Sequence, residues 1–503
     1  MPLRPRTAVL AGLLLGFLTG PLAAQVHYHD HGGPWNQRAK NGPDAEVPGW
    51  YYNLGTTGLR VELSKERPTD LLVRYVFPGS AADGKVEVGD WIVGIGGKTW
   101  KEPHQNGYGM DVFGPDGPIA AFAAAIDKAY DSKSVGKLVL RVEREDKTRK
   151  VELKLDRKAG RFADSFPFKC EKTAASLEQL RDLLVEQQRG NGSWGNPVHN
   201  TFAPLALIGS EKGTHKKALE RSVQFHADTT RAANDERWLV NWYYTSAGIV
   251  LAEYYLATEK EWVLAELQEI YDFLLTTQYM DPSQINPKAY ESHPHAIPKK
   301  PGQKIGGWGH NPGFEGYGPI QMITAQGALA LGLMKECGIE VDRERHQAAI
   351  EFLVRGTGRN GYVWYADEVA GHDRWADMGR TGAAGLAHAL DPWAKQAEMR
   401  CLANAEVIGS NPQSFPDTHA SPLMGMGYAA AAAWHEPAAF KKLMTANRWW
   451  YTLAECEDGS FAYQPNRDNA GYGGDARLAA SAVTAFVLSI PESPLCMLKR
   501  ADG

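Results

Sequence analysis

A glycine–aromatic turn recurs along the chain and constrains its architecture more than any other feature. Two close copies read Gly-Ser-Trp-Gly-Asn-Pro at 192–197 and Gly-Gly-Trp-Gly-His-Asn-Pro at 306–312, and looser copies occupy 361–364 and 458–461. Gln188 precedes the first copy, and a helical segment ending at Gln278 precedes the second. A repeat on this scale indicates stacked supersecondary units. Each copy is therefore interpreted as a tight turn with an aromatic plug, connecting an amphipathic helix to a more apolar one.

The composition is that of a soluble globular protein with more than one domain. The chain has 503 residues, of which 43% are hydrophobic and 22% charged. This length exceeds one ordinary domain. The formal net charge is -5, so the chain lacks the excess of basic residues that is typical of nucleic-acid-binding proteins. Nucleic acid is therefore excluded as the main partner. Fifteen Trp and twenty Tyr suit either buried cores or surfaces that bind sugars and peptides.

The N-terminus has the organisation of an export signal. Arg4 and Arg6 precede an apolar run at 8–18 and a small-residue site at 20–24, which predicts a signal peptide over residues 1–24. No later run approaches the ~20 apolar residues of a membrane span. The sequence therefore predicts an extracytoplasmic protein, periplasmic or secreted, without a span after cleavage. Five cysteines are too few, and odd in number, for a disulfide scaffold.

A linker is expected over residues 25–49. It contains His27, His29 and His31, which point the same way in an extended chain and could share a metal ion. The alternative is a solvated N-terminal segment, and Pro, Gly and Asn at 33–48 agree with a linker. No metal or other cofactor is assigned to the chain.

Residues 50–157 have the pattern of a small β-rich domain. An apolar strand at 71–76 leads to Pro-Gly-Ser-Ala-Ala at 78–82, and Val-Gly-Asp-Trp-Ile at 88–92 begins another strand. Residues 119–130 have helical spacing, and 137–142 and 150–155 alternate as a closing pair of strands.

This pattern resembles the bacterial PDZ domain. In that family, a glycine-rich loop presents backbone amides to the C-terminal carboxylate of a peptide. The resemblance implies that the corresponding loop here binds a peptide or protein C-terminus, with candidate residues Gly58, Leu59, Arg60 and Val61. The alternative is an intramolecular docking module without a free ligand.

Residues 172–495 alternate between apolar and amphipathic helical segments. Helices that are apolar all round are buried, and helices with one apolar stripe lie outside. The six apolar segments are 202–209, 244–256, 320–334, 378–390, 424–434 and 478–488. Their amphipathic partners are 174–188, 216–227, 262–278, 342–355, 394–407 and 438–455. About six such pairs predict a closed α/α barrel, with an open solenoid as the alternative.

The turns at 192–195 and 306–309 resemble those of the terpenoid cyclase and protein prenyltransferase toroid, which implies an (α/α)6 fold. The chain lacks the Asp-x-Asp-Asp acid of cyclases, the Asp-x-Cys zinc motif of prenyltransferases and the Gly-Cys-Gly-Glu-Gln thioester of complement-like toroids. Those activities are therefore not expected. Polysaccharide lyases, hydrolases and non-catalytic toroids remain. As a whole, the chain resembles secreted PDZ-plus-toroid proteins of unknown activity.

In such a barrel, the loops that enter the inner helices share one rim. The catalytic candidates that these loops bring together are His199, Asn200, Asp377, Arg380, Asp417, His419 and Tyr428. The candidate ligand-binding residues are Trp242, His310, Tyr317, Gln321 and Tyr472. Polar groups beside such apolar helices are costly unless they are partnered or functional. The expected ligand is an extended polar molecule, most simply a polysaccharide.

Two reaction types match these residues. A lyase would neutralise a uronate carboxylate with Asn200 or Arg380, while a base moves the C5 proton to the leaving oxygen, the candidates being His199, His419 and Tyr428. A hydrolase needs two carboxylates, for which the candidates are Asp377, Asp417 and Glu315. The third hypothesis is a non-catalytic scaffold that binds proteins or peptides.

Overall fold

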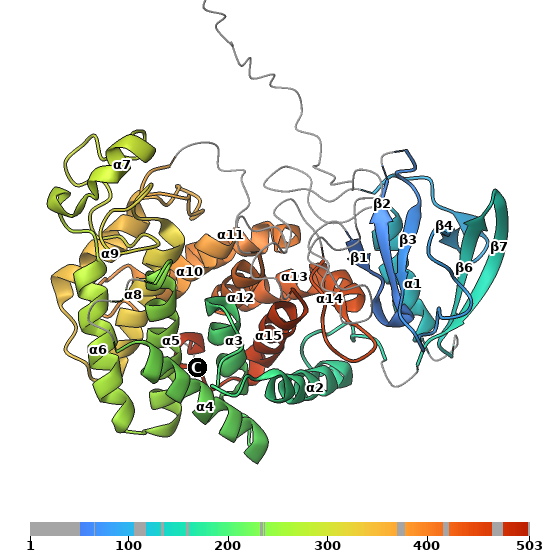
Figure 1. Cartoon of the computed structure of the whole chain (residues 1–503), viewed down its shortest axis with the longest axis horizontal. Coiled ribbons are helices and arrows are strands. Elements are labelled where there is room, and N and C mark those ends of the chain that lie inside the picture. The colour runs from blue at the N-terminus through green and yellow to red at the C-terminus, as the bar shows by residue number, and fades with distance from the viewer. Residues whose placement is uncertain are drawn as a thin grey trace, which may run out of the picture.

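The computed structural model describes residues 51–64, 66–104, 117–131, 135–156, 160–231, 235, 237–369, 378–415, 422–464 and 476–500. Within these residues, a small antiparallel sheet domain stands beside a larger helical domain (Figure 1). The predicted signal peptide, linker and histidine tract lie outside them, as do four site candidates, Asp377, Asp417, His419 and Tyr472. No helix in the described ranges combines the length and apolar character needed to cross a membrane.

The first domain is one antiparallel sheet with the order β1-β2-β3-β4-β6-β7, and β5 pairs with β4. Its strands are β1 (Tyr51–Asn53), β2 (Leu59–Leu63), β3 (Leu71–Val76), β4 (Trp91–Ile95), β5 (Lys98–Thr99), β6 (Lys137–Arg144) and β7 (Lys147–Lys154). A 3-10 turn, η1 (Gly55–Thr57), connects β1 to β2, and helix α1 (Pro118–Ala129) precedes β6.

Alternate residues along the strands form the core of the sheet domain. In β6, Leu138, Leu140 and Val142 are buried, because successive side chains of a strand point to opposite faces. Phe122 of α1 joins the same cluster. So does Leu453 of the helical domain, which is fully buried. The core of the sheet domain is thus completed by a residue about three hundred positions later in the sequence.

Six apolar helices form a closed ring in the helical domain. Each packs against the next along the chain, and the last packs against the first, which confirms the barrel over the open solenoid. These helices are α3 (Pro197–Leu207), α5 (Val240–Thr258), α8 (Gln321–Glu336), α10 (Met378–Ala389), α12 (Pro422–Ala433) and α15 (Ala476–Ser489).

The amphipathic helices pack outside this ring and give the predicted α/α toroid. They are α2 (Glu171–Gln187), α4 (Gly213–Thr229), α6 (Trp262–Thr277), α9 (Arg343–Arg355), α11 (Ala397–Ser410), and α13 (Pro437–Ala446) with α14 (Arg448–Ala454). One continuous segment was expected over 438–455. It breaks at Asn447, whose side-chain amide donates to the carbonyls of Leu443 (2.8 Å) and Pro412 (2.6 Å).

The two tryptophan turns connect the inner helices α3 and α8 to the outer helices that precede them, α2 and α6. The Trp194 indole donates to the carbonyl oxygen of Leu184 at 2.7 Å. Gly192 and Gly306 adopt positive φ values of 88° and 92°, which the left-handed region reserves largely for glycine.

A hydroxyl from the following inner helix accepts the backbone N–H of the plug residue in three of the turns. These pairs are Trp308 with Thr324 (3.0 Å), Val363 with Thr381 (3.1 Å) and Phe461 with Ser481 (2.9 Å). The looser copies at 361 and 458 are therefore true repeats of the two close ones.

The C-terminal segment packs across the ends of the inner helices α5 and α12. The buried Glu253 carboxylate accepts the backbone N–H groups of Cys496 (2.7 Å) and Met497 (2.8 Å), and the Trp434 indole donates to the carbonyl of Leu498 (3.0 Å). These contacts lie where α5 and α12 end. The opposite rim, where the inner helices begin, carries the predicted site residues Trp242, His310, Tyr317 and Arg380.

One element was not predicted. Between α6 and the second turn, the chain forms η2 (Pro282–Gln284) and α7 (Pro287–Ser292). A small separate core of Tyr279, Ala289 and Phe314 supports this insertion. It lies at the edge of the toroid in Figure 1.

Candidate functional site

Three predicted ligand-binding residues meet at the rim where α5 begins. The Trp242 indole nitrogen lies 2.8 Å from His310 Nδ1, and the rings of the two residues are stacked with centroids 5.9 Å apart. His310 Nε2 makes a short hydrogen bond with the hydroxyl of Tyr317. All three side chains are partly exposed. A line of aromatic faces and polar edges therefore runs across this part of the rim.

The line continues to a predicted catalytic residue. The ring of Tyr365 lies 5.9 Å from that of Tyr317, and the Arg380 guanidinium lies 5.5 Å from the Tyr365 centroid on its other side. Arg380 also contacts the Tyr362 hydroxyl at 3.4 Å and is mostly buried. Tyr365 was missed in the sequence, although its position directly after the turn at 361–364 places it on the same rim.

Buried side-chain amides fix the loops that carry these aromatic residues. The Asn241 side chain donates to the carbonyls of Gly309 (2.9 Å) and Asn311 (3.1 Å), which fixes the turn that carries His310. The predicted ligand-binding residue Gln321 is fully buried and donates to the carbonyls of Phe352 (2.9 Å) and Ala366 (3.1 Å). Gln321 therefore supports the site from below.

The electrostatics of His310 favour a neutral ring. Burial lowers its pKa below the ordinary histidine value, and nearby Glu315 opposes that shift. Burial penalises the charged imidazolium, and this effect prevails here. At neutral pH, His310 is a neutral ring that accepts one hydrogen bond and donates another.

His199 and Asn200 have structural roles at the start of α3. Asn200 Oδ1 accepts the backbone N–H of Trp194 at 2.7 Å, and its amide donates to the carbonyl of Gly195 at 3.1 Å. His199 Nδ1 accepts the N–H of Asn196 in a capping box. Both side chains are buried. The prediction that Asn200 neutralises a carboxylate does not fit this geometry, because both ends of its amide hold the first turn.

Tyr428 lies inside the barrel rather than at the rim. It is buried on α12 against Phe202, with ring centroids 5.3 Å apart, and its hydroxyl has no partner among the described residues. Burial raises the pKa of this phenol well above its usual range. This shift disfavours the phenolate, so Tyr428 is poorly suited to be the proton-abstracting base of a lyase.

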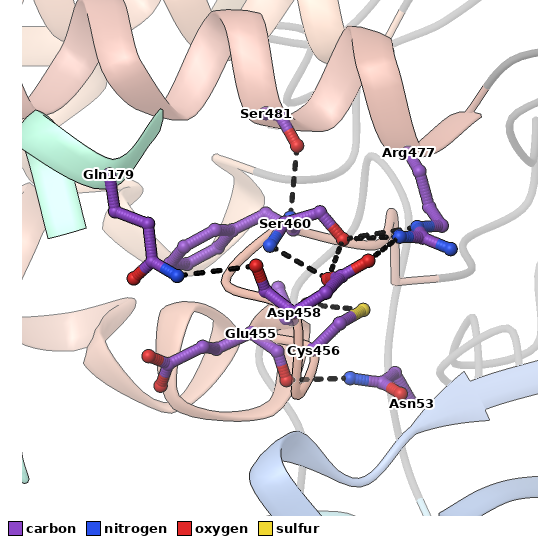
Figure 2. Close-up of polar contacts among 10 residues, drawn as sticks. Asn53, Gln179, Glu455, Cys456, Asp458, Ser460, Arg477 and Ser481 are labelled. Atoms are coloured by element: carbon purple, nitrogen blue, oxygen red, sulfur yellow. Dashed lines mark hydrogen bonds and ion pairs between the residues drawn. The ribbon is translucent and has the colours of Figure 1, made fainter. Parts of the chain in front are cut away.

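The last turn connects the toroid to the sheet domain (Figure 2). Asp458 forms an ion pair with Arg477, and its carboxylate accepts the Ser460 hydroxyl at 2.5 Å. Asn53 of β1 donates to the carbonyls of Leu453 (2.7 Å) and Glu455 (2.9 Å). Arg477 and Asp458 thus stabilise the turn on which the sheet domain rests.

A buried ion pair strengthens the same boundary. Lys172 Nζ makes a short contact with the Glu455 carboxylate, and the ammonium lies 5.0 Å from the Phe162 ring and 5.6 Å from the Tyr130 ring. Tyr130 follows α1 of the sheet domain, and Lys172 lies in α2. The ammonium is therefore enclosed by groups from both domains.

The predicted peptide-binding loop is already hydrogen-bonded within the chain. Gly58 has a φ of 76°, and Leu59, Arg60 and Val61 lie in β2, which pairs with β1 on one side and β3 on the other. Strand addition requires an unpaired edge. In this structure, β1 occupies the edge of β2 at which a peptide would pair.

One group of side chains has the composition of a metal site. Glu178, Asp182 and His215 place ligand atoms within 4.8 Å of one another. However, the Lys212 ammonium contacts both carboxylates, and His215 is bonded to Asp182 at 2.9 Å and to Ser210 at 2.7 Å. The lysine ammonium already pairs with both carboxylates, so these residues form a surface salt-bridge network.

Comparison with solved structures finds matches that cover 64% of this chain. The chain is similar to the GH76 α-mannanase BT2949 of Bacteroides thetaiotaomicron (12% identity, 64% of this chain, 96% of that chain, TM-score 0.46). It is also similar to the cellobiose 2-epimerase of Spirochaeta thermophila (12%, 64%, 100%, 0.41) and to the type II terpene cyclase MstE of Scytonema (12%, 64%, 98%, 0.40). At these identities and TM-scores, the similarities carry no argument about the function of this chain.

No curated protein matches the sequence. The family model that matches covers residues 173–495, the span of the toroid. The chain therefore belongs to the family described as domain of unknown function, DUF6288.

Proposed function

We propose that the protein is exported and that its toroid binds an extended carbohydrate along the rim formed by Trp242, His310, Tyr317, Tyr365 and Arg380. The observation that carries the proposal is the line of aromatic rings alternating with polar groups at this rim. Sugars present apolar faces and hydroxyl edges together, which aromatic faces beside polar groups complement.

Processing of the carbohydrate is the second part of the proposal. Arg380 suits a uronate carboxylate, since a guanidinium pairs with carboxylates through two parallel N–H groups. Lyase and hydrolase chemistry differ in the carboxylates required, and the candidates Asp377 and Asp417 belong to the rim loops before α10 and α12. The peptide-binding alternative has less support, because β2 is paired on both sides.

A glycan screen tests this proposal. The full chain is incubated with neutral and uronate-containing polysaccharides, and unsaturated products, new reducing ends and binding without reaction are measured separately. We expect Trp242→Ala to lower affinity about tenfold or more, in the range found for buried aromatic contacts at interfaces. The matched control is Trp262→Ala, since Trp262 is 42% exposed on the outer helix α6. The proposal fails if no glycan binds, or if the two variants bind alike.

A further inference from the structure

The hydrogen-bond directions at the rim follow from the chemistry of three side chains. An indole nitrogen can only donate, so the Trp242 N–H donates to His310 Nδ1, 2.8 Å away. His310 Nδ1 is therefore an acceptor, and the proton of the neutral ring is on Nε2. The Nε2–H in turn donates to the hydroxyl oxygen of Tyr317.

This assignment leaves the phenolic proton of Tyr317 unused. The hydroxyl oxygen accepts from His310, so its own hydrogen must be directed elsewhere. Among the described residues, His310 is the one hydrogen-bond partner of the Tyr317 hydroxyl. The side chain is partly exposed at the rim, beside Tyr365. The hydroxyl is thus a donor without an acceptor among the residues that the structure describes.

We infer that Tyr317 is the hydrogen-bond donor that selects an acceptor oxygen of the bound carbohydrate, and that Trp242 and His310 are positioning residues that orient it. The inference rests on the proposed function and extends it to specificity. Hydroxyl, ring and glycosidic oxygens of a sugar can all accept this hydrogen, and a uronate carboxylate is the strongest acceptor among the oxygens of a carbohydrate.

The surroundings of Tyr317 agree with a donor role. His293 from the α7 insertion lies with its ring 5.7 Å from that of Tyr317, and Glu315 lies two residues away in the same loop. The Arg380 guanidinium of α10 lies 5.5 Å from the centroid of the Tyr365 ring, which neighbours Tyr317. Arg380 favours an anionic ligand at this rim and Glu315 opposes it, so uronate and neutral oligosaccharides are both used as probes.

The tautomer can be measured without any ligand. Long-range 1H–15N correlation spectra of the full chain, labelled with 15N-histidine, distinguish the Nε2–H from the Nδ1–H form, and His310→Leu identifies the signal. We expect the Nε2–H form near neutral pH, and a changed Nδ1 shift in Trp242→Phe, which keeps an aromatic ring but removes the donor. A protonated Nδ1 would overturn the inference.

Binding tests the donor itself, with neutral and uronate oligosaccharides as the probes. We expect Tyr317→Phe to lower affinity about five- to tenfold, as loss of one hydrogen bond does. The control is Tyr290→Phe, because Tyr290 is exposed on α7 and lies outside the line. His310→Leu should weaken binding in the parent but add little in the Tyr317→Phe background, since residues that act as a unit are not additive.

The outcomes distinguish failure of the proposed carbohydrate binding from failure of the donor role of Tyr317. If the parent binds none of the probes, the proposed function fails whatever the tautomer proves to be. If the parent binds a probe but Tyr317→Phe matches Tyr290→Phe, or if the His310 and Tyr317 effects add in full, the donor role is wrong while carbohydrate binding stands. If Tyr317→Phe loses affinity for uronates but not for neutral glycans, the acceptor is a carboxylate.

Discussion

The indole nitrogen of Trp308 donates a hydrogen bond to the carbonyl oxygen of Leu274, 2.9 Å away. Leu274 lies in the last turn of α6, and its carbonyl oxygen also accepts the backbone N–H of Gln278 at 3.1 Å. Trp308 is fully buried in the toroid core. The tryptophan therefore fills the seam between two helices and is hydrogen-bonded to the end of one of them.

We expect Trp308→Ala to lower the free energy of unfolding by ~3–5 kcal/mol, the range for a large buried aromatic residue. Urea unfolding followed by circular dichroism measures the change. Trp238→Ala is the matched control, because Trp238 is 68% exposed and should change stability by less than ~0.5 kcal/mol. Equal midpoints for the two variants would show that Trp308 does not act as a plug.

Gly306 should tolerate no side chain. A Cβ at this position would lie 2.1 Å from the backbone oxygen of Ala348, and φ is already 92°. We expect Gly306→Ala to destabilise the protein by ~3 kcal/mol or more, from overpacking and left-handed strain together. Gly302→Ala isolates the strain, since Gly302 has a φ of 78° with nothing near its Cβ position, and should cost about 1–2 kcal/mol. Thermal unfolding of the two variants shows whether close packing at Gly306 adds to the cost of the backbone strain.

The two domains should unfold together. Leu453 of α14 is fully buried in the sheet-domain core, so Leu453→Ala should cost ~2–5 kcal/mol. We expect faster hydrogen exchange in β1, β2 and α1 as well as in α14, measured by mass spectrometry. The control is Val88→Ala in the sheet domain, where Val88 is 63% exposed. Exchange that rises in α14 alone would mean that the sheet domain is independently stable.

Two buried histidines should each lower the stability of the protein in mild acid. Burial lowers the pKa of His226 to about 4 and that of His388 to about 3. Because these values lie below the unfolded value of about 6.5, the unfolded state binds protons first as the pH decreases, and each histidine costs about 1 kcal/mol at pH 5.5. The carboxyl groups of Glu253 and Glu457 oppose this loss, because burial raises their pKa values to about 7 and the folded state then binds protons first.

Urea midpoints at pH 7.5, 6.5 and 5.5 measure this dependence. His226→Gln keeps a side-chain donor for the carbonyl of Asn200, which His226 Nε2 contacts at 2.9 Å, but cannot titrate. We therefore expect this variant to gain stability relative to the parent as the pH decreases from 7.5 to 5.5. The exposed His295 provides the control, and His295→Gln should follow the parent profile. An unchanged profile in His226→Gln would show that the buried ring is not responsible.

The sequence determined the helical architecture because its signals are local. Apolar segments without a polar face alternate six times with amphipathic segments. An apolar helix must be buried on all sides and an amphipathic helix on one, so the apolar helices lie inside a ring of amphipathic helices. The glycine–aromatic turns marked the boundaries. By contrast, the break at Asn447 and the α7 insertion escaped prediction, since one depends on a bond to Pro412 and the other on contacts with Phe314.

The tertiary structure decided which polar residues serve the fold and which line the site. His199 and Asn200 look no different in sequence from His310 and Asn311, because each pair follows the same turn. In the structure, the Asn200 amide is hydrogen-bonded to its own turn, while His310 bonds Trp242 of α5 and Tyr317 of the segment before α8. The contact of Asn53 with α14 could not be read from the sequence either. The pairs Trp242–His310 and Asn53–Leu453 connect residues far apart in the chain, so neither composition nor periodicity records them.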